Sequence, residues 1–392
     1  MRENKKSLIS VQGPAQFIAG YIACRWCEEK IWCKNNDITL LIYDTFVPTE
    51  NEILFQSSIK EIANISKIEN IIFINQVDSN QISRMHYKKS ILKLKEILEE
   101  ENFDYLFLAR DYGTFLTELL PNTYPKALKI EYGDSFGLVG NQKYLDLSFM
   151  ELLKNPFTFL KILLKKAIYS HYHKKFPFEL SVLTMPLVWD KKYLTDKELV
   201  IPNMKFVKKI FDEISSKLTE LNSYCETLLN NYSESKVYLL SNLHNSGFCT
   251  FENEIAMYEE IILKTASSGQ VIILKNHPRG SELMLSQLKE RLEKNFEIKL
   301  INDKKYSFIP IELWSTIMNN CEIFPIYSTS SIGLKYLFSK SVILTLNTKM
   351  INKYLYSDKQ KFVNEGVNMI ETAINKLENW DCDSPLWVKS NN

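Results

Sequence analysis

The sequence lacks an excess of charge of either sign. Its 392 residues include 48 Lys and Arg against 47 Asp and Glu, a formal net charge of +1 at pH 7. Proteins dedicated to nucleic acid normally carry a clear basic excess, so this balance argues against a nucleic-acid partner. Hydrophobic residues make up 45% of the chain. The length and this apolar content together predict two domains, each with its own core.

Long apolar runs are also absent. No uninterrupted apolar stretch reaches the roughly 18 residues that a membrane-spanning helix needs. The opening residues, MRENKK, are followed by only a short apolar run and show no signal-peptide pattern. These absences predict a cytoplasmic location. Residues 161–175 (KILLKKAIYSHYHKK) are the one local basic run. They predict either a solvated helix face or a peripheral contact with a polyanionic glycan or the anionic inner face of the membrane.

Glycine is scarce, with 11 residues, and neither of the common glycine-rich nucleotide fingerprints is present. Metal patterns are equally sparse. Residues 381–383 (DCD) have Asp-x-Asp spacing but lie in the terminal tail, and residues 171–173 (HYH) have no acid nearby. Cys24 and Cys27 have the spacing of a redox or zinc half-site, but no second pair follows. We therefore predict no metal site, and buried thiols in a helix.

Short apolar runs alternate with longer amphipathic stretches, the pattern of a parallel sheet covered by helices. The predicted strands are residues 7–12, 38–43, 71–75, 105–109, 127–131, 236–241, 270–275, 297–301 and 323–327. The predicted helices are residues 17–30, 51–65, 81–100, 254–266, 310–319 and a helix from residue 331. The predicted fold class is α/β, with two Rossmann-like doubly wound domains. We predict domains at residues 1–195 and 196–370, followed by a terminal helix and tail at 371–392.

The first candidate site follows the strand that is predicted to end at Glu131. The segment 127–137 reads ALKIEYGDSFG, so Gly133 and Asp134 fall in a turn directly after it. Ligands of open parallel sheets bind beyond the carboxyl ends of the strands. A sheltered carboxylate there suits a general base that takes a proton from a sugar hydroxyl. Alternatively, Asp134 and Ser135 simply cap the next helix.

The second candidate site lies at the end of another predicted strand, in residues 271–280 (VIILKNHPRG). Pro278 restricts the backbone of His277 to an extended conformation. A protonated imidazole held there could donate to a phosphate oxygen and neutralise a leaving group. Lys275 and Arg279 add positive charge. The alternative is an ordinary turn histidine in a basic surface loop.

The third candidate site is the hydroxyl-rich turn in residues 323–335 (IFPIYSTSSIGLK). It follows a predicted strand and precedes a helix. Backbone N–H groups at a helix start, with the hydroxyls of Ser330 and Ser331, can bind an anion. Ordinary serine capping of the helix is the alternative interpretation.

The order of these three signals resembles the bacterial sialyltransferase and polysialyltransferase families, the polysialyltransferase type most closely. Those families are described by a [DE]-[DE]-Gly motif, a His-Pro motif and a Ser/Thr-rich motif. Here the corresponding segments are Glu131-Tyr-Gly133, His277-Pro278 and the turn with Ser330 and Ser331. Residues 9–16 (ISVQGPAQ) and 310–312 (PIE) also resemble these families.

The resemblance implies a GT-B fold in which the N-terminal domain binds the acceptor and the C-terminal domain binds a CMP-sugar across a cleft. It implies an inverting reaction without metal or cofactor. The donor would be CMP-sialic acid or a related CMP-sugar. The glycan acceptor would belong to a bacterial surface polymer such as capsule, lipooligosaccharide or O-antigen.

Site residues are carried over from the resemblance one by one. Glu131 would be the general base, and His277 would act on the CMP phosphate. Ser330 and Ser331 would bind that phosphate, with Pro278 shaping the turn, and Glu312 would lie near the nucleotide. The chain departs from the pattern at the second motif position, which is Tyr132 rather than an acid. Asp134 is therefore an alternative base.

Rival functions remain open at this point. A CDP-glycerol-type glycerophosphotransferase also combines a GT-B-like fold with His-Pro and Ser-Ser, but usually has acids beside the serines. Residues 327–334 (YSTSSIGL) contain none. Transfer of another nonulosonate or of Kdo from its CMP-sugar fits equally well. A scaffold that binds glycan without turnover is the non-enzymatic alternative.

Overall fold

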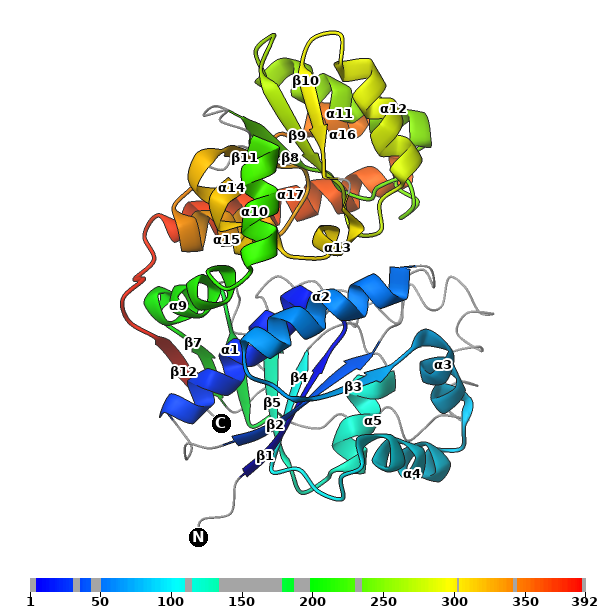
Figure 1. The fold of residues 1–392 in the computed structure, drawn as a ribbon, viewed down its shortest axis with the longest axis vertical. Coiled ribbons are helices and arrows are strands. Elements are labelled where there is room, and N and C mark those ends of the chain that lie inside the picture. The colour runs from blue at the N-terminus through cyan, green and yellow to red at the C-terminus, as the bar shows by residue number, and fades with distance from the viewer. Residues whose placement is uncertain are drawn as a thin grey trace. The chain divides into compact units, whose positions relative to one another are not determined.

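In a computed structural model of the chain, the described residues are 5–30, 36–43, 51–109, 115–133, 178–186, 198–229, 235–301, 303–340 and 344–389. The chain divides into two compact units (Figure 1), which are described separately. Unit 1 comprises Met1–Thr49, Ile59–Val207 and Cys382–Asn392, and unit 2 comprises Glu50–Ser58 and Lys208–Asp381. The chain thus passes through unit 2 once at Glu50–Ser58, enters it again after Val207 and returns to unit 1 at Cys382.

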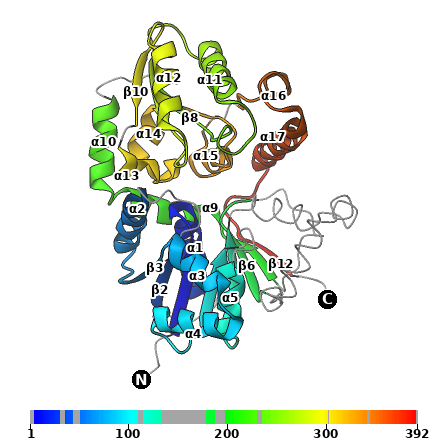
Figure 2. The ribbon, with the colours of Figure 1, turned by 90° about the vertical axis from the view of Figure 1, so that its right-hand side faces the viewer.

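Unit 1 contains an eight-stranded sheet in the order β12-β7-β6-β5-β4-β1-β2-β3. Its strands are β1 (Lys5–Val11), β2 (Asn36–Tyr43), β3 (Asn70–Ile74), β4 (Tyr105–Ala109), β5 (Leu128–Gly133), β6 (Leu180–Leu183), β7 (Glu198–Ile201) and β12 (Leu386–Lys389). Neighbouring strands are parallel except for the pair of β12 with β7. Figure 2 shows this C-terminal strand beside the strands of unit 1. The last residues of the chain, predicted as a tail, therefore include a strand that extends the first sheet.

The helices of unit 1 cover both faces of its sheet. They are α1 (Pro14–Lys30), α3 (Gln76–Arg84), α4 (Tyr87–Leu98), α5 (Phe115–Thr123), and parts of α2 (Glu52–Ile65) and α9 (Met204–Ser215). On one face α1 approaches closely at Gly20, where a Cβ atom would lie 2.7 Å from Ile9 Cγ2 and 3.1 Å from the Tyr132 ring. On the other face, α3, α4 and α5 bury Leu94 and Leu120 against strand residues such as Leu106. Each face thus excludes water through apolar packing.

Unit 2 contains a four-stranded parallel sheet in the order β10-β9-β8-β11. Its strands are β8 (Lys236–Leu239), β9 (Val271–Lys275), β10 (Glu297–Leu300) and β11 (Glu322–Pro325). Its helices are α10 (Thr219–Leu229), α11 (Phe251–Thr265), α12 (Glu282–Leu292), α13 (Lys304–Ser307), the 3-10 turn η3 (Ile311–Leu313), α14 (Ser315–Asn320), α15 (Ser330–Phe338), α16 (Thr348–Tyr354) and α17 (Ser357–Leu377).

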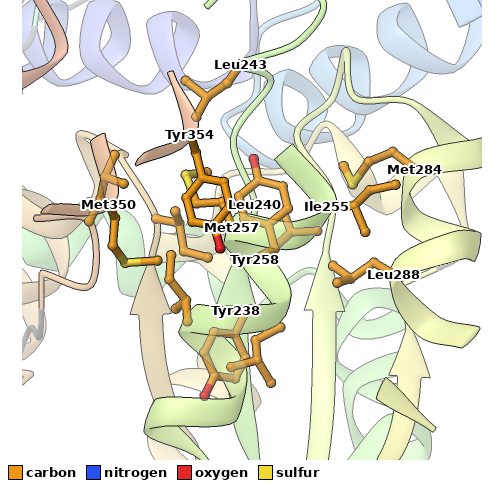
Figure 3. Packing of buried hydrophobic residues seen from close by; sticks show 14 of the residues in the cluster. Tyr238, Leu240, Leu243, Ile255, Met257, Tyr258, Met284, Leu288, Met350 and Tyr354 are labelled. Carbon is orange, nitrogen blue, oxygen red and sulfur yellow. The ribbon is translucent and has the colours of Figure 1, made fainter. Parts of the chain in front are cut away.

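The main core of unit 2 is built from α11, α12 and α16 against the sheet. Figure 3 shows Tyr238 of β8, Tyr258 of α11 and Leu288 of α12 converging in one apolar cluster. Tyr238 stacks on Phe324 of β11 with ring centroids 4.9 Å apart. The aromatic pair packs across two neighbouring strands at directly paired positions, so it stabilises the register of β8 and β11.

The predicted fold class is confirmed: the chain is α/β, with two Rossmann-like units built on parallel sheets. Three local predictions need correction or comment. The helix predicted at 81–100 is two helices, α3 and α4, with Met85 and His86 between them. Strand β5 runs on to Gly133 rather than ending at Glu131. The basic run at 161–175 lies outside the described residues.

Candidate functional site

Three turns lie at the carboxyl edge of the unit 2 sheet, one after each of β8, β9 and β11. Because β8 lies between β9 and β11, its turn neighbours both of the others. The side-chain amide of Asn245 donates a hydrogen bond to the carbonyl oxygen of Arg279 at 3.2 Å. The hydroxyl of Ser241 donates to the carbonyl oxygen of Ile326. The three turns are therefore tied together at the edge where parallel sheets bind ligands.

His277 lies in a tight turn just after β9. The turn is closed by the Gly280 N–H, which donates to the His277 carbonyl oxygen at 2.7 Å. The Arg279 N–H donates to the imidazole Nδ1 of His277 at 3.1 Å. A nitrogen that accepts this bond carries no proton, so the neutral ring holds its proton on Nε2. The backbone thus presents a partly exposed imidazole as a hydrogen-bond donor.

The charge state of His277 differs from the sequence-based expectation. Burial, together with repulsion from Arg279 and Lys275, lowers the imidazole pKa to about 4. At neutral pH the ring without ligand is therefore neutral, not protonated as we predicted. The Nε2–H can still donate to a phosphate oxygen. A bound anion would raise the pKa again, because opposite charge favours the imidazolium.

Lys275 is the last residue of β9, so its buried amine lies next to this turn in the chain. Its side chain is 7% exposed, and Nζ donates to the Ser307 carbonyl oxygen at 2.9 Å. Nζ also lies 5.6 Å from the centre of the Trp314 ring. Burial lowers the Lys275 pKa to about 8, against the attraction of Glu312. At pH 7 the amine still carries most of its charge, so the site is electropositive.

Glu312 lies in η3 and is 7% exposed. Its attraction to Lys275 places the carboxylate near the end of β9. The turn η3 also packs against α15, the helix that follows the serine-rich turn. Glu312 therefore lies within the same part of unit 2 as Lys275 and the start of α15.

The two predicted phosphate-binding serines have different environments. Ser331 is fully buried, and its hydroxyl donates to the Ser328 carbonyl oxygen at 2.7 Å. Ser330 is partly exposed, and its N–H donates to the Ser328 hydroxyl at 3.2 Å. Ser331 therefore stabilises the start of α15 from inside, whereas the Ser330 side chain is accessible. Sequence reasoning did not single out Ser328, which caps this helix in place of Thr329.

A buried carboxylate on α11 was also missed from the sequence. Glu254 is 3% exposed. It accepts hydrogen bonds from the N–H groups of Leu243 and His244, both at 2.8 Å, and from the Tyr258 hydroxyl at 2.6 Å. Tyr258 in turn accepts from the Ser241 N–H at 3.1 Å. Glu254 thus holds the turn after β8 in one conformation. An acid in the first turn of a helix gives no sequence signal for this role, because such acids are common.

Glu131 lies in unit 1, within β5 and not at its end. The side chain is fully buried, and the Ser181 hydroxyl of β6 donates to Oε2 at 2.7 Å. Its neighbour Tyr132 points to the opposite face, where its hydroxyl donates to the Ser10 carbonyl oxygen at 2.6 Å. The aromatic residue at the second motif position therefore anchors α1 and β1 rather than serving as an acid.

Two further candidates lie at the end of β5. Gly133 is its last residue, and its carbonyl oxygen accepts from the Thr184 N–H at 3.1 Å. Asp134 lies outside the described residues. Glu131 and Gly133 thus belong to unit 1, and the other described candidates belong to unit 2.

The prediction that Cys24 and Cys27 are buried thiols in a helix is confirmed. Cys24 and Cys27 are both buried in α1, and burial raises the pKa of each thiol.

The Asp-x-Asp segment in the terminal tail forms no metal cluster in the described structure, and its Asp383 forms an ion pair with Lys205 at 2.7 Å. Among the described residues, no group of three or more His, Cys, Asp or Glu side chains could hold a metal ion. No helix in the described part of the chain is long and apolar enough to cross a membrane.

Comparison with known families identifies a large part of the chain. Residues 138–347, more than half of the sequence, match the family described as alpha-2,8-polysialyltransferase (POLYST). The chain belongs to the alpha-2,8-polysialyltransferase family. It is therefore a glycosyltransferase, as predicted. The stretch that matches this polysialyltransferase family contains His277, Glu312 and Ser330, but begins after Glu131 and Asp134. No curated protein matches the chain significantly.

Solved structures show the same fold at low sequence identity. The UDP-GlcNAc 2-epimerase of Methanocaldococcus jannaschii, in complex with UDP-GlcNAc and UDP, is 14% identical with a TM-score of 0.50, over 98% of this chain and 95% of that one. A Listeria monocytogenes protein assigned as a UDP-N-acetylglucosamine 2-epimerase is 10% identical with a TM-score of 0.51, over 96% and 95%. These similarities support the GT-B fold of this polysialyltransferase-family chain, and the fold alone.

Proposed function

We propose that this chain transfers sialic acid, or a related nonulosonate, from a CMP-sugar to a bacterial surface glycan such as capsule, lipooligosaccharide or O-antigen. Family membership supports a glycosyl transfer. The observation that carries the choice of a nucleotide-phosphate donor is the His277 turn. There a backbone N–H fixes a donor imidazole at the end of a parallel strand, next to a buried lysine.

Unit 2 would bind the donor phosphate. The Nε2–H of His277 donates to a phosphate oxygen, and Lys275 at the end of β9 contributes positive charge. The start of α15 adds the positive end of a helix dipole, and Ser330 adds an accessible hydroxyl. Ser331 supports that helix start rather than the ligand. Binding of the singly charged phosphodiester of the donor raises the His277 pKa, so the imidazole can pass a proton to the phosphate oxygen as the bond to the sugar breaks and a second negative charge develops there.

The chemistry of the donor explains why such a site suffices. The anomeric carbon of a sialic acid is tertiary and carries a carboxylate, so the transition state has the character of a cation. The bond from this carbon to the CMP oxygen breaks as the glycan hydroxyl oxygen attacks from the opposite side, which inverts the configuration. The protein must chiefly stabilise the departing phosphate, and a preorganised cationic site does this without a metal.

Glu131 is the proposed base that takes the proton of the attacking hydroxyl. Its carboxylate is buried and oriented by Ser181. Asp134 is the alternative base, since it follows the same strand.

A donor screen tests the proposal. Purified protein is incubated in EDTA with CMP-sialic acid, CMP-Kdo, CDP-glycerol or UDP-GlcNAc and a panel of glycans, and free nucleotide and product mass are measured. We expect CMP release and a glycan extended by sialic acid. Turnover with CDP-glycerol or UDP-GlcNAc alone would replace the proposed donor class. Activity that appears only when a divalent ion is restored would overturn the metal-independent step.

A further inference from the structure

His244 is a second histidine at the carboxyl edge of the unit 2 sheet. It lies in the turn between β8 and α11, and its side chain is partly exposed. Since β8 lies between β9 and β11, this turn is flanked by the His277 turn and the serine-rich turn. Asn245, the next residue, donates to the carbonyl oxygen of Arg279 in the His277 turn.

The backbone around His244 is held rigidly. Its N–H donates to the buried carboxylate of Glu254 at 2.8 Å, and its carbonyl oxygen accepts from the Gly247 N–H at 2.8 Å. Gly247 has φ of +74°, a conformation that glycine adopts without strain. The neighbouring Leu243 is buried and is bonded to Glu254 in the same way. The position of His244 is therefore set before any ligand binds.

The imidazole itself is held on one side only. Nδ1 lies 3.4 Å from the carbonyl oxygen of Cys249, and the ring meets Phe251 edge-on with centroids 5.6 Å apart. A carbonyl oxygen can only accept, so in the neutral ring this contact places the proton on Nδ1 and leaves a lone pair on Nε2. Within the described ranges, no protein group is hydrogen-bonded to that Nε2.

The two histidines therefore have opposite tautomers. His277 accepts at Nδ1 and presents Nε2–H, whereas His244 donates at Nδ1 and presents the Nε2 lone pair. The first suits a phosphate oxygen, and the second suits a ligand group that donates a hydrogen bond. Neither ring can adopt the other tautomer without losing the contact of its Nδ1 with the backbone.

We propose that Nε2 of His244 accepts a hydrogen bond from the nucleoside part of the donor, either from a ribose hydroxyl or from the exocyclic amine of the base. The inference rests on the proposed function, because it takes the bound nucleotide to be CMP. In this assignment His277 binds the phosphate and His244 binds the nucleoside. The two histidines lie in adjacent turns that are joined by the hydrogen bond from Asn245 to the Arg279 carbonyl oxygen.

The test is binding of nucleotides by calorimetry to wild type, His244→Ala and His244→Gln. The probes are CMP, UMP, which lacks the amine, and the 2′,3′-dideoxy analogue of CMP, which lacks the ribose hydroxyls. We expect His244→Ala to weaken CMP binding roughly tenfold, as for one lost hydrogen bond. His244→Gln retains a side-chain oxygen that can accept, so we expect it to recover part of the loss. Unchanged thermal unfolding of each variant shows that the fold is kept.

The probes separate the two ligand groups. If the loss caused by His244→Ala disappears with UMP, the contact is to the amine, and if it disappears with the dideoxy analogue, the contact is to the ribose. His277→Ala, in contrast, should weaken all three nucleotides equally. An equal loss for all three in His244→Ala, or no loss in either His244 variant, would overturn the inference while leaving the proposed function standing. Absence of CMP binding to the wild type would overturn the proposed function, and this inference with it.

Discussion

The backbone N–H of Arg279 donates to Nδ1 of His277 across Pro278, at 3.1 Å. The proline has no N–H of its own and a restricted φ, so the turn offers one donor to the ring in one geometry. The contact decides which imidazole nitrogen faces the ligand. It also opposes protonation, because a protonated ring would have to give up its acceptor at Nδ1.

His277→Ala should lower the rate of transfer by about a hundredfold or more, with the fold intact, because a positioned donor to the leaving phosphate is lost. His277→Gln keeps an amide N–H near the position of Nε2. We therefore expect it to retain more activity than the alanine variant. Steady-state rates with saturating donor measure both. An alanine variant within a few-fold of the wild type would exclude this role.

The depressed pKa of His277 predicts a loss of stability in acid. Its folded-state pKa is about 4 against an ordinary 6.5, so the unfolded chain binds more protons between these values. Stability from the neutral ring is complete above pH 6.5 and is lost as the pH falls toward 4. After allowance for partial exposure, we expect a contribution of about 2 kcal/mol. Urea unfolding at pH 7 and pH 4.5 should show wild type losing this much more than His277→Gln; parallel losses would contradict the assigned shift.

Glu131→Gln should abolish glycan transfer and leave the affinity for CMP nearly unchanged, because Glu131 and the proposed nucleotide site belong to different units. The amide keeps the shape of the carboxylate but cannot take a proton. Calorimetry with CMP and a transfer assay separate the two effects. Asp134→Asn is the matched control and should matter less. If it alone stops transfer, Asp134 is the base.

The turn that carries His277 has no room for a side chain at Gly280. A Cβ atom there would lie 2.0 Å from Oδ1 of the buried Asn276. Gly280→Ala should therefore destabilise unit 2 by about 1–3 kcal/mol. Removing the obstacle in Gly280→Ala/Asn276→Ala should recover part of that loss. A double variant as unstable as the sum of the two single ones would show that the clash is not the cause.

Much of the fold follows from periodicity alone. Strand β4 matches its predicted range, and α1, α2 and α11 were placed within a few residues. The extension of β5 beyond Glu131 was not predictable, because it depends on pairing of Tyr132 with Ala109 and of Gly133 with Leu183 on neighbouring strands. The break between α3 and α4 was also not predictable from periodicity. It is accompanied by a hydrogen bond between the two helices, from the Ser90 hydroxyl to the Ile82 carbonyl oxygen.

The sequence predicted the positions of the turns in the candidate site, but not the role of each side chain in them. It singled out His277 from a strand followed by His-Pro, but not its tautomer or its neutral charge, which come from Arg279 and burial. It treated Ser330 and Ser331 alike, although only the direction of each side chain separates an accessible hydroxyl from a buried one. Burial and side-chain direction depend on packing partners far away in the chain.

The most direct measurement is mass spectrometry of a defined glycan acceptor incubated with CMP-sialic acid and the purified protein, with His277→Ala in parallel. The account predicts product masses increased by whole sialic acid residues, with one CMP released for each, and at least a hundredfold less product with the variant. An unextended acceptor across a broad glycan panel, or equal extension by wild type and His277→Ala, would contradict it.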